Sequence, residues 1–285
     1  MRFQGLVLVA LAAAALPTQA FAWGQEGHSI VAEIAQRALT PAAAAQVAKL
    51  LGPQVSMASV ASWADDQKGA STYPNNAVWH YVDIPLADKA YNPATECANG
   101  DCVIAAIDKA EVQMSCATDA ATRADWLKFL IHFVGDIHQP LHTIAEATGG
   151  NDIKVTVGFQ GKMKPAPAFD TNLHAVWDST LITKTVYDWG AMVDIIEADK
   201  AIMATAAADA LDLKTLDWAL ETHALASGAW AVPAAPDTTH NPVLDQTYYT
   251  TQIPVVEAQL AVAGLRLAGV LNHFLDAAPA CRASL

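Results

Sequence analysis

Apolar residues recur at helical spacing along most of the chain. Residues 30–39 place their apolar positions on one face, as an amphipathic helix does. Thr40 is suited to cap a second, alanine-rich helix with Pro41 at its first position, and Gly52-Pro53 should stop it. The same spacing predicts further helices over residues 103–114, 121–137, 191–208, 217–226 and 252–274.

A β-strand is expected at one place. Residues 153–159 (IKVTVGF) alternate between apolar and polar, and they should form a short hairpin that turns near Gln160-Gly161. The fold is therefore predicted to be mainly α. Because no Gly/Ser-rich or Pro-rich linker separates two cores and no segment repeats, residues 23–285 are expected to form a single domain.

Residues 1–22 have the features of a secretory signal peptide. Arg2 supplies the positive start, residues 6–16 are apolar but too short to span a bilayer, and the sequence AFA fits the rule for cleavage before Trp23. A retained N-terminal anchor, the alternative, would need a longer apolar run. We expect a secreted or periplasmic protein without a membrane segment.

The chain is acidic. It contains 16 Lys and Arg against 29 Asp and Glu, which gives a net charge of −13. Such a surface should repel nucleic acid and anionic membranes, because binding to polyanions normally relies on Lys and Arg. An activity on phosphates would then take its positive charge from bound divalent cations.

Four cysteines in an exported chain favour disulfides, since the compartments outside the cytoplasm are oxidising. Cys97 and Cys102 close a short loop, which leaves Cys116 and Cys281 to join an early helix to the C-terminus. Four cysteines allow three pairings, and the sequence alone leaves the other two open.

The strongest indication of a metal site is ADWLKFLIHFVGDIHQPLH, residues 124–142. His132 and Asp136 are four residues apart, so on a helix both project from one face. Pro140 then ends the helix and presents His142. Their neighbours are apolar, and a polar pair buried there without partners would cost roughly several kcal/mol. Binding a metal ion removes that cost.

Other candidate ligands are spread along the chain. His174 and Asp178 are again four apart, and Asp65 and His80 each lie close to a tryptophan. His28 follows the expected cleavage site closely, so the new amino terminus could add an amine and a carbonyl. A lone histidine on an apolar helix is more often a core residue, but two His-x3-Asp pairs favour a metal centre. Nitrogen and oxygen ligands suit zinc, and their number exceeds the need of one tetrahedral ion.

Together these motifs resemble those of the zinc-dependent type I nucleases of fungi and plants, the P-one nucleases, in a bacterial version. The resemblance covers nearly the whole mature length, through WGQEGH, ASWADDQK, WHYVD, FLIHFVGDIHQPLH, GGNDIKV, NLHAVWD and YYTTQIPVVEAQLAVAGLRLAG. Each motif alone is moderately specific, so the order and spacing carry the likeness. It implies the single-domain helical fold that these nucleases share with zinc phospholipase C.

The resemblance also implies three zinc ions. One would be bound by Asp65, His80, His132 and Asp136, a second by His142, His174 and Asp178, and a third by the amine and carbonyl of Trp23 with His28 and Asp136. Residue types alone do not separate Asp65 from Asp66, and the family pattern selects Asp65. His138 is not expected to be a ligand, because it follows Asp136 by two residues and so points away from that helix face.

Residues that act on the substrate follow from the same resemblance. Asp65 would be catalytic as a ligand that orients the attacking water. Lys68 occupies the place of a family arginine near the phosphate, and lysine keeps the charge but loses the bidentate fork. Tyr81 would stack on a nucleobase and Asp83 would hydrogen-bond it. Since stacking requires an unstacked base, single strands should be preferred.

The implied activity is that of a secreted zinc-dependent endonuclease on single-stranded RNA and DNA. A metal pair can lower the pKa of a bridging water toward about 7 and so supply the nucleophile. With the second zinc stabilising the departing 3′ oxygen, the products would be 5′-phosphorylated, and 3′-nucleotidase activity would follow from the same geometry. Nucleic acid and nucleotides would be its substrates, and a monomer with no stable protein partner is expected.

Two other functions fit part of the pattern. A zinc phospholipase C acting on phosphatidylcholine-type lipids would share the helical three-zinc design, but Asp178, the GGNDI motif and the pair of Tyr81 and Asp83 favour the nuclease. An exported zinc-binding protein without turnover would need a broken ligand set, and all nine ligand positions are intact.

Overall fold

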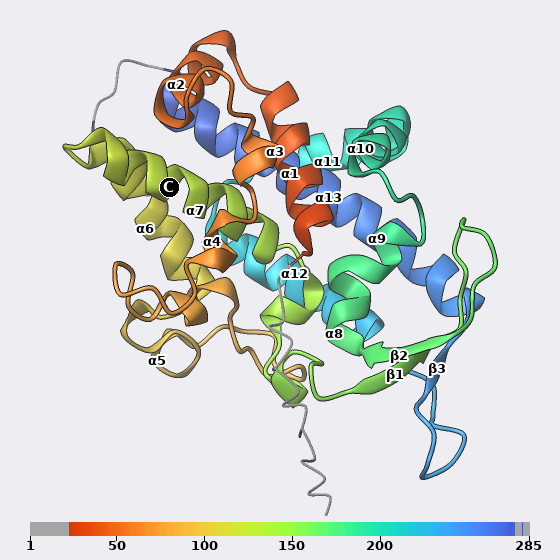
Figure 1. Cartoon of the computed structure of the whole chain (residues 1–285). Coiled ribbons are helices and arrows are strands. Elements are labelled where there is room, and N and C mark those ends of the chain that lie inside the picture. The colour runs from red at the N-terminus through yellow and green to blue at the C-terminus, as the bar shows by residue number, and fades with distance from the viewer. Residues whose placement is uncertain (1–22, 277–280, 282–285) are drawn as a thin grey trace, which may run out of the picture.

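Helices account for most of this computed structural model, which describes residues 23–276 and residue 281 (Figure 1). The predicted signal peptide lies outside the described residues. The long helices are α1 (Gln25–Arg37), α2 (Pro41–Leu51), α6 (Val103–Cys116), α7 (Ala120–Asp136), α10 (Trp189–Ala198), α11 (Lys200–Asp209), α12 (Thr215–Ala229) and α13 (Gln246–Leu275). The mainly α prediction is confirmed.

Short helical turns connect the long helices and carry much of the candidate site. The α-helical turns are α3 (Met57–Val60), α4 (Trp63–Asp66), α5 (Pro93–Glu96), α8 (Leu173–Ala175) and α9 (Leu181–Thr183). The 3₁₀ turns are η1 (Asn76–His80), η2 (Ala98–Gly100), η3 (Pro140–Thr143) and η4 (Glu146–Thr148), and η5 (Val176–Thr180) is a π-helical turn. None of these turns was predicted, because each is too short to show a period of its own.

Side-chain caps fix where two of the long helices begin. Thr40 accepts a hydrogen bond from the backbone N–H of Ala43 at the start of α2, where Pro41 holds the first position, as the sequence predicts. Asp119 accepts from the N–H of Thr122 and so begins α7. α7 begins at this cap and carries His132 and Asp136 near its C-terminal end.

The prediction of one helix over residues 191–208 is wrong. The chain forms α10 and α11 instead, and Asp199 lies between them in extended conformation with φ −78° and ψ 96°. Its carboxylate accepts from the N–H groups of Ala201 and Ile202, which makes it the N-cap of α11. The apolar spacing continues across the break, so the periodicity alone did not show it.

α13 is the central helix of the core. It packs against α1, α7 and α11, and Figure 1 shows it running through the length of the molecule. Val256, Leu260 and Leu271 on this helix are fully buried. Its length and apolar composition would allow it to cross a membrane, but 61% of its most apolar window is buried inside the protein. Its burial identifies α13 as the core helix of a globular domain.

The predicted hairpin is part of a larger arrangement. β1 (Lys154–Val157) pairs antiparallel with β2 (Phe169–Asn172), with Val155 opposite Thr171, and parallel with β3 (Val243–Leu244). The strand and a turn near Gln160-Gly161 were expected, and the N–H of Met163 donates to the carbonyl of Gln160 across that turn. The hairpin is longer than expected, because the connection between β1 and β2 extends from residue 158 to residue 168. A two-residue strand such as β3 is too short to predict from alternation.

Both disulfides expected from the cysteine spacing are present. Cys97 pairs with Cys102 and closes the short loop, and Cys116 at the end of α6 pairs with Cys281. The second bridge joins positions 165 residues apart. Bridges of this kind form and persist in oxidising compartments.

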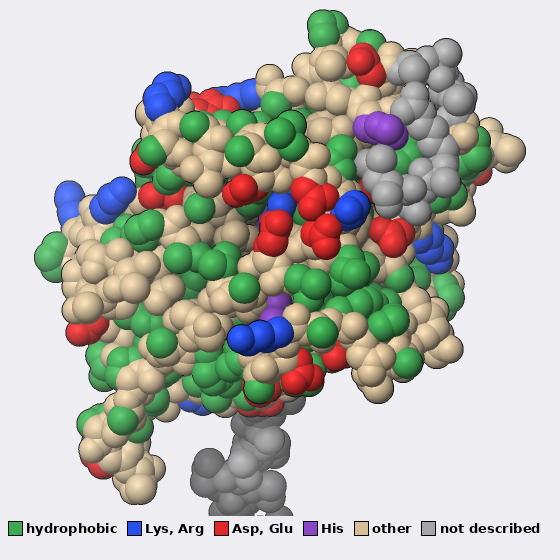
Figure 2. All heavy atoms as spheres, turned by 180° about the vertical axis from the view of Figure 1, so that it is seen from behind, with side chains coloured by type: hydrophobic (Ala, Val, Ile, Leu, Met, Phe, Trp, Pro, Cys, Tyr) green, Lys and Arg blue, Asp and Glu red, His purple; other side chains and the backbone are tan. Residues whose placement is uncertain are grey.

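The acidic composition is visible on the surface. On the face turned away from the viewer in Figure 1, Asp and Glu side chains gather near the middle, with some Lys and Arg side chains between them (Figure 2). The acidic side chains of this face would repel a polyanion, and the basic ones among them reduce that repulsion.

Candidate metal centre

The buried histidines and aspartates of the chain meet beside the C-terminal end of α7. His132 and Asp136 come from α7 itself, and the others come from α1, α4, η1, η3, α8 and η5. None is more than 6% exposed. The full set is His28, Asp65, His80, His132, Asp136, His142, His174 and Asp178.

These side chains form three buried clusters able to bind metal ions. Within each cluster the potential ligand atoms lie within 4.8 Å of one another. The clusters are His28, His132 and Asp136; Asp65, His80 and His132; and His142, His174 and Asp178. Asp136 Oδ2 is also 2.9 Å from His80 Nδ1, so this carboxylate lies between the first two clusters.

Backbone carbonyls fix the orientation of three imidazole rings. The Nδ1–H of His132 donates to the carbonyl of Ala61 at 2.7 Å, and that of His142 donates to the carbonyl of His80 at 2.7 Å. The Nδ1–H of His174 donates to the carbonyl of Gly149 at 2.6 Å. When such a ring is neutral, it directs the lone pair of Nε2 into the centre, as histidines that bind metal ions do.

The donor set fits divalent cations. His142 Nε2 lies 3.1 Å from His174 Nε2, so two lone pairs face each other and repel unless a cation lies between them. Both ring nitrogens of His28, His80 Nε2 and Asp136 Oδ1 are buried without a hydrogen bond. Buried polar atoms normally have partners, and a metal ion would supply them here.

The electrostatics keep most of the rings neutral. Burial lowers the pKa of His28 and of His80 to about 4 and that of His174 to about 3. Burial acts the same way on His132, but the carboxylates of Asp136 and Asp65 outweigh it and raise the pKa of His132 to about 10. That site therefore attracts positive charge strongly, and a divalent cation would replace the proton.

The pKa values of the carboxylates of Asp65 and Asp178 are shifted in opposite directions. Burial raises the pKa of Asp65, but His132 and Lys68 overcome it and hold that pKa well below its usual range. Lys68 Nζ lies 2.7 Å from Asp65 Oδ1. Burial raises the pKa of Asp178 well above its usual range. A cation beside Asp178 would favour its ionised form.

Gln139 contacts the candidate metal centre, and the sequence reasoning missed it. Its Nε2 donates to Asp178 Oδ1 at 2.7 Å, and its Oε1 accepts from the N–H of Leu141 at 2.6 Å. Its side chain therefore orients Asp178 and shapes the turn that presents His142. In the sequence, Gln139 lies between His138 and Pro140 in the motif richest in candidate ligands, and this position was the available indication. A buried amide side chain must find hydrogen-bond partners, and here the partners are Asp178 and Leu141.

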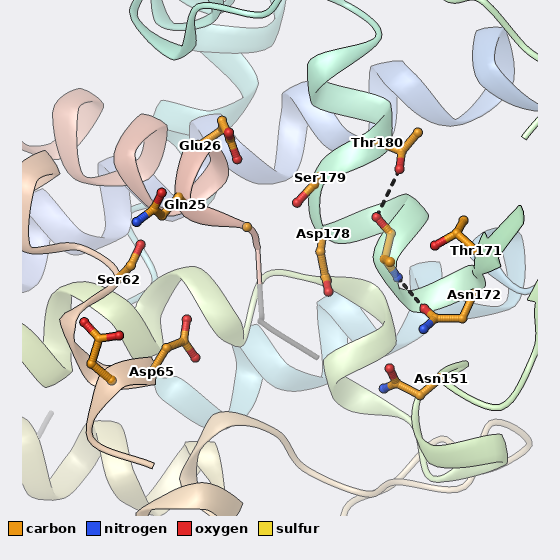
Figure 3. A pocket seen from close by; sticks show the side chains of 13 residues that line it. Gln25, Glu26, Ser62, Asp65, Asn151, Thr171, Asn172, Asp178, Ser179 and Thr180 are labelled. Carbon is orange, nitrogen blue, oxygen red and sulfur yellow. Dashed lines mark hydrogen bonds between the residues drawn. The ribbon is translucent and has the colours of Figure 1, made fainter. Parts of the chain in front are cut away.

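His174 and Asp178 lie side by side, as their spacing of four residues predicts, although the local structure is not a plain α-helix. His174 lies in α8, and Asp178 lies in the π turn η5, with His174 Nε2 3.5 Å from Asp178 Oδ2. The Oγ1 of Thr180 donates to the carbonyl of Ala175 across this wider turn (Figure 3). π turns inside helices occur frequently at functional sites.

The GGND motif has a structural reason. Gly149 has φ +61°, and a Cβ there would lie 2.6 Å from the carbonyl oxygen of Leu141 and 3.3 Å from His174 Nδ1. Its own carbonyl holds the His174 ring. Glycine is therefore required both by the backbone conformation and by the close approach of the imidazole.

The substitution Gly149→Ala should destabilise the protein by about 1–3 kcal/mol, since alanine is strained at this φ. It should also weaken metal binding at the His142, His174 and Asp178 cluster about 10- to 100-fold, because the ring loses its orientation. Thermal unfolding and a metal titration would measure the two effects. Gly228→Ala is the matched control, because a Cβ there meets nothing within 4 Å. If both variants had the same stability and the same metal affinity, the structural role proposed for Gly149 would be contradicted.

Two cavities open from the centre. One, of about 640 Å³, places Asp65 and Asp178 on facing walls, with Gln25 and Glu26 from α1 nearby (Figure 3). The other, of about 610 Å³, is lined by Lys68, Tyr81 and Asp83 together with His80, His142 and His174. All three residues predicted to contact the substrate therefore lie in one cavity beside the clusters.

The ring of Tyr81 is half-buried in this second cavity. Burial raises the pKa of Asp83. Burial is also the larger cause that raises the pKa of Tyr81, and the negative charge of Asp83 is the smaller one. The phenol is therefore neutral over the physiological range. It offers a ring face and a hydroxyl, and Asp83 offers a carboxylate that accepts hydrogen bonds.

Trp23 is fully buried at the beginning of the described chain. A Cβ on Gly27 would lie 2.7 Å from Trp23 Cβ, and a Cβ on Gly135 would lie 2.7 Å from His28 Nδ1. These two glycines let the indole and the His28 ring sit against α1 and α7. The first predicted mature residue is thus built into the wall of the metal centre.

Histidines outside the clusters have structural partners or lie on the surface. His138 donates from Nδ1 to the carbonyl of Val134 and accepts at Nε2 from Arg266, so both ring nitrogens are used away from the clusters, as expected. His223 is buried and bridges the carbonyls of Thr143 and Asp88. His240 is exposed.

The chain is similar to known nucleases over almost its whole described length. A family model described as S1/P1 Nuclease matches residues 23–276. Nuclease P1 of Penicillium citrinum is 31% identical over 88% of this chain and 97% of its own length, and Endonuclease 4 of Arabidopsis thaliana is 33% identical over 91% of each. Nuclease S1 of Aspergillus oryzae is 26% identical over 94% of this chain and 96% of its own. With its helical fold and its three buried His/Asp clusters, the chain belongs to the S1/P1 nuclease family of hydrolases that act on phosphodiester bonds.

Proposed function

We propose that this chain is an exported endonuclease that uses three zinc ions to hydrolyse single-stranded RNA and DNA to 5′-phosphorylated products, and that it also removes 3′-phosphates from nucleotides. The observation that carries the proposal is the set of three adjoining buried clusters in a member of a nuclease family. The two disulfides support export, because such bridges persist in oxidising compartments. We also predict a bacterial origin, a monomeric state and no membrane partner.

The ligand sets are those expected from the resemblance. Asp65, His80, His132 and Asp136 would hold one ion; His142, His174 and Asp178 a second; and the amine and carbonyl of Trp23, with His28 and Asp136, a third. Zinc suits these nitrogen and oxygen donors, and three carboxylates among them leave an excess of positive charge at the centre. When bound, the ions supply an activated water and neutralise the phosphate oxygens.

Side chains near the proposed ions would position the substrate for hydrolysis. Lys68 lies beside Asp65 and can contact a phosphate oxygen from the second cavity. Tyr81 offers a ring on which an unpaired base can stack, worth about 1–3 kcal/mol, and Asp83 accepts hydrogen bonds from the edge of that base. Gln139 keeps Asp178 directed toward the centre. A base paired within a duplex cannot reach Tyr81, which supports a preference for single strands.

Parallel assays would test the function. The zinc-loaded protein is expected to cleave a single-stranded oligonucleotide and a 3′-nucleotide, to cut a duplex of the same sequence at least about tenfold more slowly because unpairing costs energy, and to leave phosphatidylcholine vesicles intact. Release of phosphocholine in place of nucleotides would favour the phospholipase alternative. Full zinc content with no hydrolysis of any phosphate ester would favour a zinc-binding protein without turnover.

A further inference from the structure

A loop closed by a disulfide lies close to Tyr81 and Asp83, the two residues proposed to bind the base. Next to the second cavity is another of about 550 Å³, and this base-binding pair lines both. The outer cavity is also lined by Asp101, which belongs to residues 97–102, the segment that the first disulfide closes. This segment, here called the bridged loop, therefore borders the same cavity as the base-binding pair.

Two hydrogen bonds tie the bridged loop and the residue after it to the segment that carries Tyr81. The indole Nε1–H of Trp79 donates to Asp101 Oδ1 at 3.1 Å. The backbone N–H of Val103 donates to the carbonyl of Tyr81 at 2.9 Å. Asp101 and Val103 are the two chain neighbours of Cys102, and Trp79, Cys102 and Val103 are all buried. Both bonds therefore depend on where the disulfide holds Cys102.

The disulfide restricts the bridged loop to one shape. Between its two cysteines the chain passes through Asn99 and Gly100, whose φ angles of 61° and 76° lie in the left-handed region. An open segment would sample many other conformations, because each residue that is not fixed gains backbone entropy. A cross-link removes most of these conformations. The bridge thus keeps the hydrogen-bonding groups of the loop in place at the beginning of α6.

The metal ligand in the same segment has supports of its own. His80 Nδ1 lies 2.9 Å from Asp136 Oδ2, and the carbonyl of His80 accepts from the Nδ1–H of His142 at 2.7 Å. The backbone N–H of Val82 donates to the carbonyl of His142 at 2.9 Å. These contacts come from α7 and η3 and do not involve the bridged loop. Loosening the loop should therefore affect the base-binding pair more than the metal centre.

We propose that the bridged loop is a positioning element for base recognition. The Cys97–Cys102 disulfide holds the loop against residues 79–81, and this contact orients the ring of Tyr81 toward a nucleobase. The loop sets how much the base adds to binding and leaves the chemistry at the phosphate unchanged. This inference rests on the proposed function, in which a base stacks on Tyr81.

The test uses two ligands that differ only in the base: a deoxynucleoside 5′-monophosphate and the same sugar phosphate with hydrogen in place of the base. Calorimetry on the zinc-loaded protein gives the ratio of their Kd values, which requires no turnover. The corresponding 3′-phosphates give the ratio of kcat/KM. In the wild-type protein the base should improve each quantity at least about fivefold, as stacking on an aromatic ring does.

The double variant Cys97→Ser/Cys102→Ser should reduce both ratios about fivefold, because the base loses its ordered stacking partner. The effect should come from weaker binding and a higher KM of the nucleotide, with the base-free ligand and the content of three zinc ions unchanged. Cys116→Ser/Cys281→Ser is the matched control, since it removes the bridge at the opposite end of α6 from Val103. It should lower stability and leave both ratios unchanged.

Asp101→Ala is a second variant, which keeps the bridge and removes the acceptor of the Trp79 indole. It should lower both ratios about twofold, as the loss of one hydrogen bond would, and it decides the question if the bridge variant does not fold.

Several results would overturn the proposal. They are a wild-type protein that binds both ligands equally, a folded bridge variant that keeps the wild-type ratios, an equal loss for both ligands, and a control that lowers the ratios as much. If the bridge variant does not fold, wild-type ratios in Asp101→Ala overturn it. If the wild type binds the nucleotide more tightly but hydrolyses no phosphate ester, the proposed function fails and the Kd ratios alone decide on the loop.

Discussion

Removal of the metal ions by a chelator should abolish hydrolysis and lower the unfolding temperature by more than about 10 °C. The centre contains two facing lone pairs on His142 and His174 and a group of buried polar atoms without hydrogen bonds, and bound metal cations would stabilise both. A ligand at 1,000 times its Kd stabilises a fold by about 4 kcal/mol. Each kcal/mol shifts the midpoint of a domain of this size by roughly 2–4 °C.

Calorimetry before and after chelation, with the metal content measured on the same samples, would check this result. Zinc added back should restore both activity and the unfolding temperature. The samples must stay free of reductant, because loss of the Cys116–Cys281 bridge would lower stability by a separate route. A metal-free chain that unfolds at the original temperature would show that the clusters do not bind structural cations.

Asp136→Asn should have the largest effect of any single substitution, because Asp136 lies within reach of His28, His80 and His132. The asparagine keeps the size of the side chain but loses the negative charge between two clusters. We expect kcat/KM to fall by at least about 10³ and the bound zinc to fall from three ions toward one, since a carboxylate shared by two ions is lost. Activity assays and metal analysis would measure both.

Asp125→Asn is the matched control on the same helix. Asp125 is a half-buried carboxylate of α7 that contacts Lys128 and Tyr73 and takes no part in the clusters. Its loss should change stability by about 1 kcal/mol or less and leave the zinc content intact. If Asp136→Asn folds and retains three ions and most of its activity, the cluster assignment is wrong.

The sequence predicted those parts of the molecule whose signal is local. The His-x3-Asp spacing placed His132 beside Asp136 and His174 beside Asp178, because four residues make about one helical turn. The mainly α fold followed from long runs of helical periodicity. The pairing of Cys97 with Cys102 followed from the short loop between them.

Features that depend on tertiary contacts escaped prediction. The break at Asp199 interrupts a run whose apolar spacing is continuous, so only the cap geometry shows it. The carbonyl of Gly149 and the amide of Gln139 orient ligands from segments whose meeting no local pattern encodes. The choice of Asp65 over Asp66 came from the family likeness, and the structure places Asp65 in the buried cluster and Asp66 on the surface.

The burial of Trp23 beside the metal centre has a consequence for when the enzyme would become active in the cell that makes it. With the proposed ligand set, a precursor that still carries its leader has an amide nitrogen where the third ion needs a free amine. Such a precursor would be a zymogen whose activating cut is made only on export, and RNA inside the producing cell would be spared. Purification tags should accordingly be placed after residue 285 and never ahead of Trp23.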